Sequence, residues 1–504
     1  MKRVGVIDIC SNYIRVILSE IEDSGYFRVI DELSEPVKLA LDLIDNNFIT
    51  EEKVNITINT LRAFKSLCVT SGATKIIVVA TEALRDADNA EYIIEKISSE
   101  LNLDVKILTL KDEIYYNYMG VKNSIYTTNS LLIDISGTCT HLAWVKNGQI
   151  IESTTLPIGS LNISYGFNLR DRIIHSDFEN AKSSIMDCIT SIPWLKKGNF
   201  DNIIGVGGAF RNVGKIDRIR KRYPLLITHN YELTNTDLCE ILNLLKSKDL
   251  NQRIKVDGVS KDRVDIIVGT TLIMKVLTYF LDITQLKICG RGMREGLLFD
   301  YIIKNLGPID DIVDYSIRGI MESLNVNKDH AEHVYTILKT LYEQLRPLHH
   351  LGNEYDNVIK TASLLHDSGI SIKYYNHHIH SFYVILNAYM NGLTHKELLL
   401  SACTAAFHRN NSYTVPLAQY SSIINRLDVD IVEKIGILLR ISESLDRSLE
   451  GAVKYLDVKI ADEIVSINVY SSIPLELEIR DALRARYKFK EIYHRELEIQ
   501  NIVV

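Results

Sequence analysis

The chain twice shows a pattern in which an apolar run, a short turn of small polar residues and a second apolar run follow one another. The first copy is VGVIDICSNYIRVIL at residues 4–18, and the second is LLIDISGTCTHLAWV at residues 131–145. Each copy predicts a β-hairpin with a carboxylate, Asp8 or Asp134, at the end of its first strand. One such hairpin alone is also typical of an ordinary buried core. The matched pair predicts a duplicated architecture in which both turns face one cleft.

The turns and carboxylates of these hairpins suit phosphate binding. Turns of small residues expose backbone N–H groups that can hold phosphate, and carboxylates can hold Mg²⁺ through its water shell. A third junction has the same character, because an apolar run at 202–206 opens directly on Gly207 and Gly208. A strand–glycine–helix junction allows the backbone to approach a phosphate or a nucleotide ring closely.

The rest of the hydrophobic pattern alternates strands and helices up to about residue 300. Asp112 and Glu113 fall in the first turn of a predicted helix, where the helix dipole favours negative charge. From about 310 to 450 the pattern is almost purely helical, and the last 50 residues return to short strands and a basic helix. The predicted strands are 26–31, 75–80, 105–108, 131–135, 141–146, 150–156, 202–206, 285–289, 453–460, 463–469 and 475–479, and the main predicted helices are 51–68, one beginning within 81–89, 110–121 and 262–280.

Length and composition limit the class of protein. A chain of 504 residues exceeds one hydrophobic core, and we predict domains at 1–123, 124–305, 306–450 and 451–504. A net charge of −7 gives no global attraction for polyanions, so no sequence-specific nucleic-acid binding is expected. Seven cysteines without CxxC spacing predict free thiols in a reducing compartment. With no signal-peptide pattern and no long uncharged apolar run, we expect a cytoplasmic protein without a membrane segment.

Seven segments in register resemble the exopolyphosphatase/guanosine pentaphosphate phosphohydrolase (Ppx/GppA) family over nearly the whole chain. The resemblance implies an α/β fold of two actin-like (sugar kinase/Hsp70-like, RNase H-type) lobes, followed by an all-helical HD-type domain and a small α/β cap. It also implies a homodimer and an active site between the lobes that uses Mg²⁺ or Mn²⁺. The matching segments are VGVIDICSNYIRV, VVATEALRDADN, DEIYYNYMGV, LLIDISGTCTHL, LPIGS, IGVGGAFRN and ICGRGMREGLL.

Hydrolysis of a phosphoanhydride needs charge neutralisation, a positioned water and a group that activates it. The resemblance assigns water activation to Glu113 and neutralisation of the substrate chain to Arg85. Singly, Glu113 is also explained as a helix N-terminal charge and Arg85 as a surface ion pair. Asp8 and Asp134 would position the Mg²⁺. The predicted phosphate-binding residues are Ser11, Asn12, Gly137, Cys139, Thr140, Gly207 and Gly208.

Both phosphate loops depart from the family pattern. The first reads Cys-Ser-Asn-Tyr at 10–13 instead of Gly-Ser-Asn-Ser, and Ser136 and Thr138 replace glycines in the second. A Cβ at these positions limits close approach of phosphate. His141 stands where the family has a glutamate near the metal, and a histidine can still coordinate a softer metal or contact phosphate. Slow activity, use of a different metal and loss of activity therefore all stay open.

The helical region contains the H…HD…D order of HD-domain proteins. Two imidazoles and two carboxylates from separate helices make a credible site for Mn²⁺, Fe²⁺ or Zn²⁺, and His380 and His408 can extend it to a second metal. A structural, accessory role for this region is the alternative. The four residues that define the order are His330, His366, Asp367 and Asp446.

Two basic clusters are candidate guides for a polyanion. Their spacing is equally that of solvated helix faces, which are the commoner case. The first cluster follows the Gly207-Gly208 junction and is the better candidate because of that position. The clusters are Arg211, Lys215, Arg218, Arg220, Lys221 and Arg222, and Arg480, Arg484, Arg486, Lys488 and Lys490.

The predicted function is a metal-dependent phosphohydrolase that releases terminal phosphate from inorganic polyphosphate or guanosine pentaphosphate. One alternative is a hydrolase that uses the HD-type metal site, with lobes that only sense nucleotide. The other is a non-enzymatic sensor whose altered cleft binds polyphosphate or a guanosine penta- or tetraphosphate.

Overall fold

The computed structural model describes residues 1–409 and 413–504, and the side chains of residues 44–46 lie outside this description. The described chain separates into two compact units, Met1–Ile312 and Val313–Val504. The first unit contains two β-sheets with their helices, which we call lobe I and lobe II. The predicted domain borders after residues 123, 305 and 450 remain predictions.

Lobe I is built on a five-stranded sheet in the order β3-β2-β1-β4-β5. The first predicted hairpin forms β1 and β2, which pair antiparallel, and β4 joins β1 in parallel. The strands are β1 Lys2–Ile9, β2 Ile14–Ile21, β3 Phe27–Glu35, β4 Lys75–Ala80 and β5 Val105–Ile107. This sheet agrees with the strands that the hydrophobic pattern predicts.

Lobe II repeats the theme with a six-stranded sheet in the order β10-β11-β9-β6-β7-β8. The second predicted hairpin forms β6 and β7, and β9 runs parallel to β6. The strands are β6 Asn129–Ile135, β7 Thr140–Lys146, β8 Gln149–Leu156, β9 Asn202–Val206, β10 Tyr231–Thr234 and β11 Gln285–Ile288. The short strand β10 had no sequence prediction.

Helices cover both sheets of the first unit, and two of the predicted helices are shorter than expected. The predicted helix at 262–280 divides into a 3₁₀ turn, η1 Lys261–Arg263, and α11, and the helix expected from 81–89 divides into α3 and α4. The helices are α1 Ala40–Asn46, α2 Glu51–Thr70, α3 Glu82–Arg85, α4 Ala90–Leu101, α5 Leu110–Lys122, α6 Ser160–Gly166, α7 His175–Thr190, α8 Gly207–Arg220, α9 Asn235–Lys246, α10 Leu250–Arg253, α11 Ile267–Phe280 and α12 Met293–Leu306.

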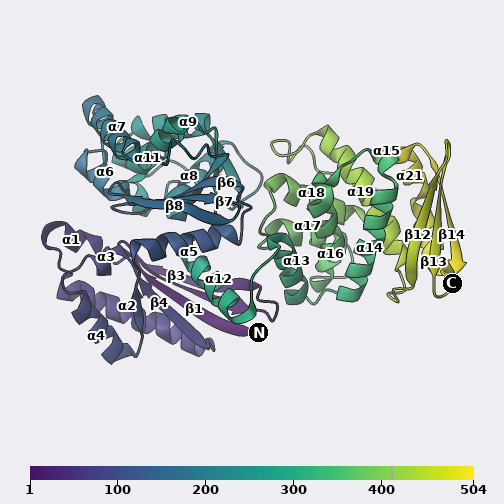
Figure 1. Cartoon of the computed structure of the whole chain (residues 1–504), viewed down its shortest axis with the longest axis horizontal. Coiled ribbons are helices and arrows are strands. Elements are labelled where there is room, and N and C mark those ends of the chain that lie inside the picture. The colour runs from purple at the N-terminus through teal and green to yellow at the C-terminus, as the bar shows by residue number, and fades with distance from the viewer. Residues whose placement is uncertain (410–412) are drawn as a thin grey trace. The chain divides into compact units, whose positions relative to one another are not determined.

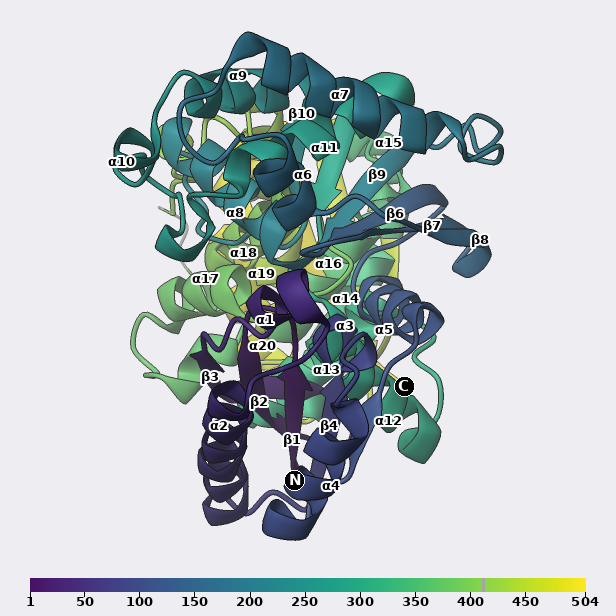
Figure 2. The same cartoon turned by 90° about the vertical axis from the view of Figure 1, so that its left-hand side faces the viewer.

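Side-chain alternation along β1 and β6 decides where the two hairpin carboxylates point. Ile7 and Ile9 of β1 pack into the core that α2 and α4 complete, so Asp8 points to the opposite face. Ile133 and Ile135 of β6 pack into the core of lobe II, so Asp134 also points the other way, toward α5. Each strand therefore presents one aspartate to the face of its sheet opposite that core. Figure 2 shows the sheet that contains β1 below the sheet that contains β6.

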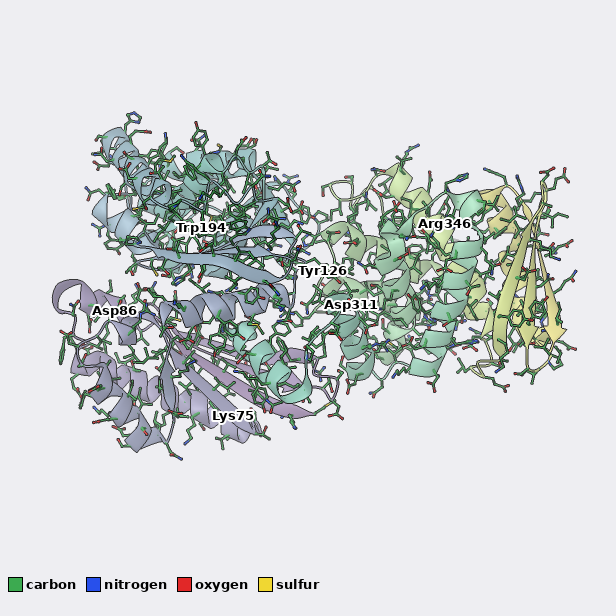
Figure 3. All side chains as sticks on the ribbon, in the orientation of Figure 1. Lys75, Asp86, Tyr126, Trp194, Asp311 and Arg346 are labelled. Carbon is green, nitrogen blue, oxygen red and sulfur yellow. The ribbon has the colours of Figure 1, made fainter. Side chains whose placement is uncertain are left out.

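Helices α5 and α12 pair with each other, and α5 lies between the two sheets (Figure 1). Glycines make the contact close, because a Cβ built on Gly296 would lie 1.8 Å from the carbonyl oxygen of Tyr116. A Cβ on Gly120 would lie 2.7 Å from the carbonyl oxygen of Gly292. Beyond the two helices, the Tyr126 hydroxyl donates a hydrogen bond of 3.1 Å to Asp311 (Figure 3).

Helix α12 follows lobe II in sequence but packs on lobe I. It contacts β1, and the Phe299 ring meets the Phe27 ring of β3 edge to face at 5.1 Å. The GRGMREGLL segment thus carries the chain from lobe II back to lobe I. Its glycines provide the surface on which α5, the helix of Glu113, is seated.

The second unit begins with the predicted helical region and ends with a three-stranded sheet in the order β12-β13-β14. Residues 410–412 of the helical prediction lie outside the described residues. The helices are α13 Ile312–Ser323, α14 Lys328–Gln344, α15 Arg346–His349, α16 Asp356–Leu365, α17 His377–Asn387, α18 His395–Phe407, α19 Arg426–Leu445, α20 Glu476–Ala482 and α21 Arg486–Tyr493, and the strands are β12 Val453–Ile460, β13 Ile464–Ser471 and β14 Glu496–Val503.

The predicted strand at 475–479 is wrong, because this segment enters helix α20. Apolar residues alternate at Leu475, Leu477 and Ile479, which suggests a strand, but the buried side chains are Leu475, Glu478 and Ala482. That spacing is helical. The third strand of the sheet is instead β14 at the C-terminal end, which pairs with β13 in parallel.

Candidate functional site

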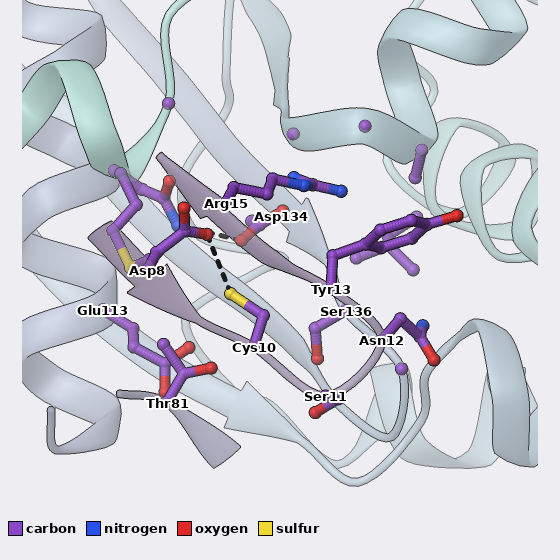
Figure 4. Close-up of a pocket in the computed structure, with 18 of the residues that line it drawn as sticks. Asp8, Cys10, Ser11, Asn12, Tyr13, Arg15, Thr81, Glu113, Asp134 and Ser136 are labelled. Atoms are coloured by element: carbon purple, nitrogen blue, oxygen red, sulfur yellow. Dashed lines mark hydrogen bonds between the residues drawn. The ribbon is translucent and has the colours of Figure 1, made fainter. Parts of the chain in front are cut away.

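A cavity of about 160 Å³ lies between lobe I and lobe II, and residues of both hairpin turns line it. Glu113 and Tyr13 lie on opposite sides of this pocket, with Cys10 and Asp134 between them (Figure 4). The structure therefore leaves space where a phosphoryl group is expected. The predicted site residues that line the cavity are Asp8, Ser11, Asn12, Glu113, Asp134, Gly137, Gly207 and Gly208.

Of the two hairpin carboxylates, Asp8 is buried and only partly hydrogen bonded, and Asp134 is half-buried. The Cys10 thiol donates to Asp8 Oδ2 at 3.0 Å, and Arg294 Nε lies 3.5 Å from Asp8 Oδ1. Within the described residues, Asp8 Oδ1 has no hydrogen-bond donor. Asp134 accepts a hydrogen bond of 2.8 Å from the Asn117 amide of α5.

Gly207 permits the approach of α8 to Asp134. Its φ is +88°, and a Cβ built there would lie 2.5 Å from Asp134 Oδ1. The first glycine of the strand–glycine–helix junction is therefore required by both conformation and space. The second, Gly208, borders the guanidinium of Arg263, which a Cβ would meet at 2.5 Å.

Glu113 is held by two cationic side chains. Its Oε1 accepts a hydrogen bond from Arg85 Nη1, and its Oε2 lies 3.5 Å from His141 Nε2. The carboxylate sits in the first turn of α5, which a capping box formed by Thr109 and Asp112 begins. Arg85 is anchored in turn by a hydrogen bond of 3.0 Å to the carbonyl oxygen of Leu108.

His141 takes a different place from the one that the sequence suggests. It does not line the cavity, and its Nδ1 lies 3.0 Å from Thr155 Oγ1. Burial opposes a charge on the imidazole, but hydrogen bonds to Cys139 and Glu113 and the nearby charge of Asp134 raise its pKa to about 10. At neutral pH His141 is therefore a cation that contacts Glu113.

Cys139 and Thr140 also lie outside the cavity lining. The Thr140 hydroxyl is buried and donates to the carbonyl oxygen of Ile158 at 2.6 Å, so it holds the turn before α6. Cys139 Sγ lies 3.1 Å from Ser136 Oγ and 3.6 Å from His141 Nε2. Both side chains are therefore engaged inside the hairpin turn, unlike Gly137, which faces the cavity.

Four arginines line the cavity, and three of them were missed from the sequence. They come from β2, α8, η1 and α12, so only the folded chain brings them together. Burial lowers the pKa of Arg211 and of Arg263, and neighbouring guanidinium groups lower each further. Guanidinium groups suit phosphate oxygens. The same lining also holds five carboxyl groups, those of Asp8, Glu82, Glu113, Asp134 and Glu295. The four arginines are Arg15, Arg211, Arg263 and Arg294, of which Arg211 belongs to the first predicted basic cluster.

Most residues of the two predicted basic clusters form hydrogen bonds or ion pairs outside the cavity. Arg218 is buried and donates to the carbonyl oxygen of Leu225, while Arg220 and Lys221 both pair with Asp217. Near the C-terminal end, Arg484 pairs with Asp481 within its own helical segment. Lys488 and Lys490 likewise pair with Glu491 and Glu496. These clusters are largely charge-paired faces, and Arg211 is their one member in the cavity lining.

The second unit gathers four imidazoles around Asp367. His377 Nε2 lies 3.0 Å from Asp367 Oδ1, and His408 Nε2 lies 3.6 Å from the same oxygen. On the other side, His366 Nε2 and His330 Nε2 lie 3.6 and 3.8 Å from Asp367 Oδ2. Two groups of three ligand atoms result, which share Asp367.

Hydrogen bonds at the far ring nitrogens orient these imidazoles. Nδ1 of His366, His377 and His408 lies within hydrogen-bonding distance of a backbone carbonyl, at 2.6, 2.8 and 2.5 Å. Nδ1 of His330 meets Asp446 Oδ2 at 2.7 Å. Hydrogen bonds at the ring nitrogen that faces away from the metal fix the orientation of metal-binding histidines. Asp446 therefore orients His330, and His377 occupies the position for which the sequence suggested His380.

The fold and the cavity define a two-lobed, actin-like α/β protein. The profile of the Ppx/GppA phosphatase family matches residues 17–305, and that of the Ppx/GppA phosphatase domain III matches residues 312–480. The chain belongs to the Ppx/GppA phosphatase family. Within the described part of the chain, no helix is both long and apolar enough to cross a membrane.

Individual relatives agree with this assignment. The chain is 29% identical over 287 residues to a bifunctional 3-dehydroquinate synthase/phosphatase of Fusobacterium nucleatum, covering 54% of this chain but only 43% of that relative. It is 25% identical over 405 residues to a guanosine-5'-triphosphate,3'-diphosphate pyrophosphatase of Pseudoalteromonas atlantica, covering 78% of this chain and 76% of the relative.

Solved structures share the fold of the first unit. The Aquifex aeolicus member of the Ppx/GppA family has a TM-score of 0.55 at 24% identity, covering 60% of this chain and 99% of that structure. An exopolyphosphatase from Cytophaga hutchinsonii has a TM-score of 0.56 at 20% identity, covering 60% and 98%. At these identities the likeness concerns the fold.

Proposed function

We propose that the protein is a phosphohydrolase that releases the terminal phosphate of inorganic polyphosphate or guanosine pentaphosphate at the cavity between its lobes. The observation that carries this proposal is the placement of Glu113, a carboxylate fixed by Arg85 and His141 on the wall of a cavity lined by four arginines. The names of the pyrophosphatase and exopolyphosphatase relatives support the choice of substrates.

The side chains divide the chemistry between them. Glu113 accepts a proton from the attacking water, because its carboxylate lies on the cavity wall and its contacts with Arg85 and His141 fix its orientation there. The arginines neutralise charge on the phosphate chain, and backbone N–H groups of the turns at Ser11 and Gly137 hold its end. His141 acts on Glu113 rather than on a metal ion.

The carboxylates of Asp8 and Asp134 fit a Mg²⁺ or Mn²⁺ ion held through its water shell. Asp8 Oδ1 is buried without a hydrogen-bond donor in the described residues, as expected of an oxygen that faces metal-bound water. The groups of three close ligand atoms found in the described residues lie in the second unit, so direct binding by several side chains is not favoured in the cavity. A bound cation would neutralise phosphoryl oxygens.

The experiment that tests this function is phosphate release, measured on polyphosphate and guanosine pentaphosphate side by side with Mg²⁺ or Mn²⁺. We expect release from at least one substrate and none from the heat-denatured protein. Tight binding of both substrates without turnover in any metal would instead favour the sensor alternative. The expected homodimer remains a prediction, which sedimentation of the full chain checks.

The cluster of four histidines around Asp367 in the second unit favours a second function, the binding of divalent metal. We propose that His330, His366, Asp367, His377 and His408 bind divalent metal there, as an HD-type site would. His366 Nε2 is fully buried and has no hydrogen-bond partner in the described residues, as expected of a ring nitrogen that serves as a metal ligand. Burial and the nearby His366 hold the pKa of His408 well below its usual value, which keeps the ring in the neutral, metal-binding form.

Metal content distinguishes this site from an accessory helical domain. We expect His377→Ala to lose metal bound by the full-length protein, because its Nε2 faces Asp367. His380→Ala, three residues along α17, should retain the metal and serves as the matched control. Equal metal content in the two variants, measured by mass spectrometry of the purified protein, would contradict the assignment. If His366→Ala abolished phosphate release and Glu113→Gln did not, hydrolysis would take place at this metal site instead of in the cavity.

A further inference from the structure

Glu82 occupies the space between the two phosphate turns. It is the first residue of α3, at the carboxyl end of β4, and it lines the cavity with only 7% of its surface exposed. The Ser11 hydroxyl donates a hydrogen bond of 2.7 Å to its Oε2. A Cβ built on Gly137, in the turn of the other lobe, would lie 3.8 Å from the same oxygen. Its carboxyl group therefore reaches both turns.

The charges around Glu82 differ from those around Glu113. Arg85, on the same short helix, pairs with Glu113 and with Asp86, and Glu82 forms no ion pair with any residue that the structure describes. Burial raises the pKa of Glu82, and the charges of Glu113 and Asp86 raise it further, while the Ser11 hydrogen bond and Arg85 oppose the rise. The other ionisable groups that face the cavity are Asp8, Cys10, Tyr13, Arg15, Asp134, Arg211, Arg263, Arg294 and Glu295.

An ionised Glu82 would obstruct the proposed reaction in two ways. A carboxylate between the turns repels a phosphate that approaches them. It also accepts the single hydrogen bond that the Ser11 hydroxyl can donate, so this hydroxyl cannot donate to a phosphate. A protonated carboxyl group carries no charge, and its own O–H can donate a hydrogen bond to a phosphoryl oxygen while its carbonyl oxygen still accepts from Ser11.

We propose that Glu82 is a phosphate ligand that acts as a neutral carboxylic acid, so that substrate binding takes up a proton. The proton comes from solvent, stays on the Glu82 carboxyl group while its O–H donates to the terminal phosphate, and returns to solvent on release. The two buried glutamates of the cavity then differ in role: Glu113, which contacts Arg85 and His141, is the base, and Glu82, which forms no ion pair with a described residue, is the donor. This inference rests on the proposed function, since it names a residue of the same site.

The test measures proton uptake when tripolyphosphate binds. Calorimetric titrations in two buffers of different ionisation enthalpy, from about pH 6 to about pH 9, report the protons taken up. The Glu113→Gln protein, which should not turn over the ligand, is compared with Glu113→Gln combined with Glu82→Gln. On the alkaline side we expect about one more proton per bound chain with Glu82 than with glutamine. Glu91→Gln, an exposed site on α4, is the matched control and should behave like the parent.

Steady-state kinetics supply an independent readout. With Glu82 present, KM should rise roughly tenfold per pH unit above its pKa, whereas Glu82→Gln, whose amide imitates the neutral acid, should keep a flatter KM. If Glu82→Gln fails to fold, Ser11→Ala replaces it. Without the Ser11 hydrogen bond, which lowers the pKa of Glu82, the onset of proton uptake should move to higher pH, and an unmoved onset would contradict the inference. If the proteins with glutamate and with glutamine at position 82 bind tripolyphosphate with equal proton uptake, the inference about Glu82 is wrong and the proposed function is unaffected. Absence of tripolyphosphate binding in every variant would overturn the proposed function with it.

Discussion

Replacing Glu113 with glutamine should lower phosphate release by about 10²- to 10⁴-fold, the range that general-base catalysis contributes. Glutamine has the same shape but accepts a proton far less readily, and it would present an amide to Arg85 and His141 in place of a carboxylate. Because the change acts on the chemical step, kcat should fall more than KM rises. Initial rates of phosphate release on the better of the two substrates measure this loss.

The neighbouring carboxylate offers a matched control. Asp112→Asn, one residue earlier in α5, removes a negative charge from the same helix turn but keeps an oxygen that can accept the Thr109 backbone hydrogen bond. Its rate should stay within a few-fold of the parent. If Asp112→Asn and Glu113→Gln were equally slow, the helix-terminal charge rather than a specific base would explain the effect. If Glu113→Gln were as fast as the parent, Glu113 would have no catalytic part.

Gly296→Ala should destabilise the first unit by about 3 kcal/mol, the upper part of the range for overpacking. The new Cβ would lie 1.8 Å from the Tyr116 carbonyl oxygen and 3.2 Å from the Gly120 nitrogen. Both atoms belong to the backbone of α5, so a side-chain rotation cannot relieve the contact. Helix α5 must move, and Glu113 moves with it, so activity should fall as well as stability.

Gly166→Ala is the control for this substitution. Gly166 ends helix α6, and a Cβ there would meet no atom within 4 Å. Urea denaturation of the full chain can be monitored by the phosphate release that remains. The midpoint should fall to a lower urea concentration for Gly296→Ala and stay unchanged for Gly166→Ala. Equal midpoints for Gly296→Ala and the parent would show that α5 and α12 can separate at little cost.

Local patterns in the sequence were sufficient for the strands and turns that form the cavity. The apolar alternation around Asp8 and Asp134 gives each aspartate its face, and the small residues after each strand mark the turns. The convergence of Arg15, Arg263 and Arg294 has no local signal, because they lie on elements far apart in the chain. The resemblance located His141 beside the site, but only the tertiary contacts show that it pairs with Glu113.

The same limit explains the errors in the second unit. Segment 475–479 has a two-residue apolar period over only five residues, too short to distinguish a strand from a helix whose buried positions are three and four apart. The sequence NHHIHSF offers three histidines within one helical turn, and spacing alone does not choose among them. The start of α17 at His377 decides the matter, because it directs His377 rather than His380 toward Asp367.

The return of α12 to lobe I determines how the two lobes can move. In the part of the chain that the structure describes, the backbone crosses from one lobe to the other at two places, between α5 and β6 and between β11 and α12. We expect a rotation of the lobes about these two connections to move α5 and Glu113 little, because α5 also packs on α12. Such a rotation would have to break the hydrogen bond that Tyr13 of lobe I donates to Asp262 of lobe II. On the proposed function, we expect a long phosphate chain to enter beside Tyr13, on the side of the pocket opposite Glu113 (Figure 4).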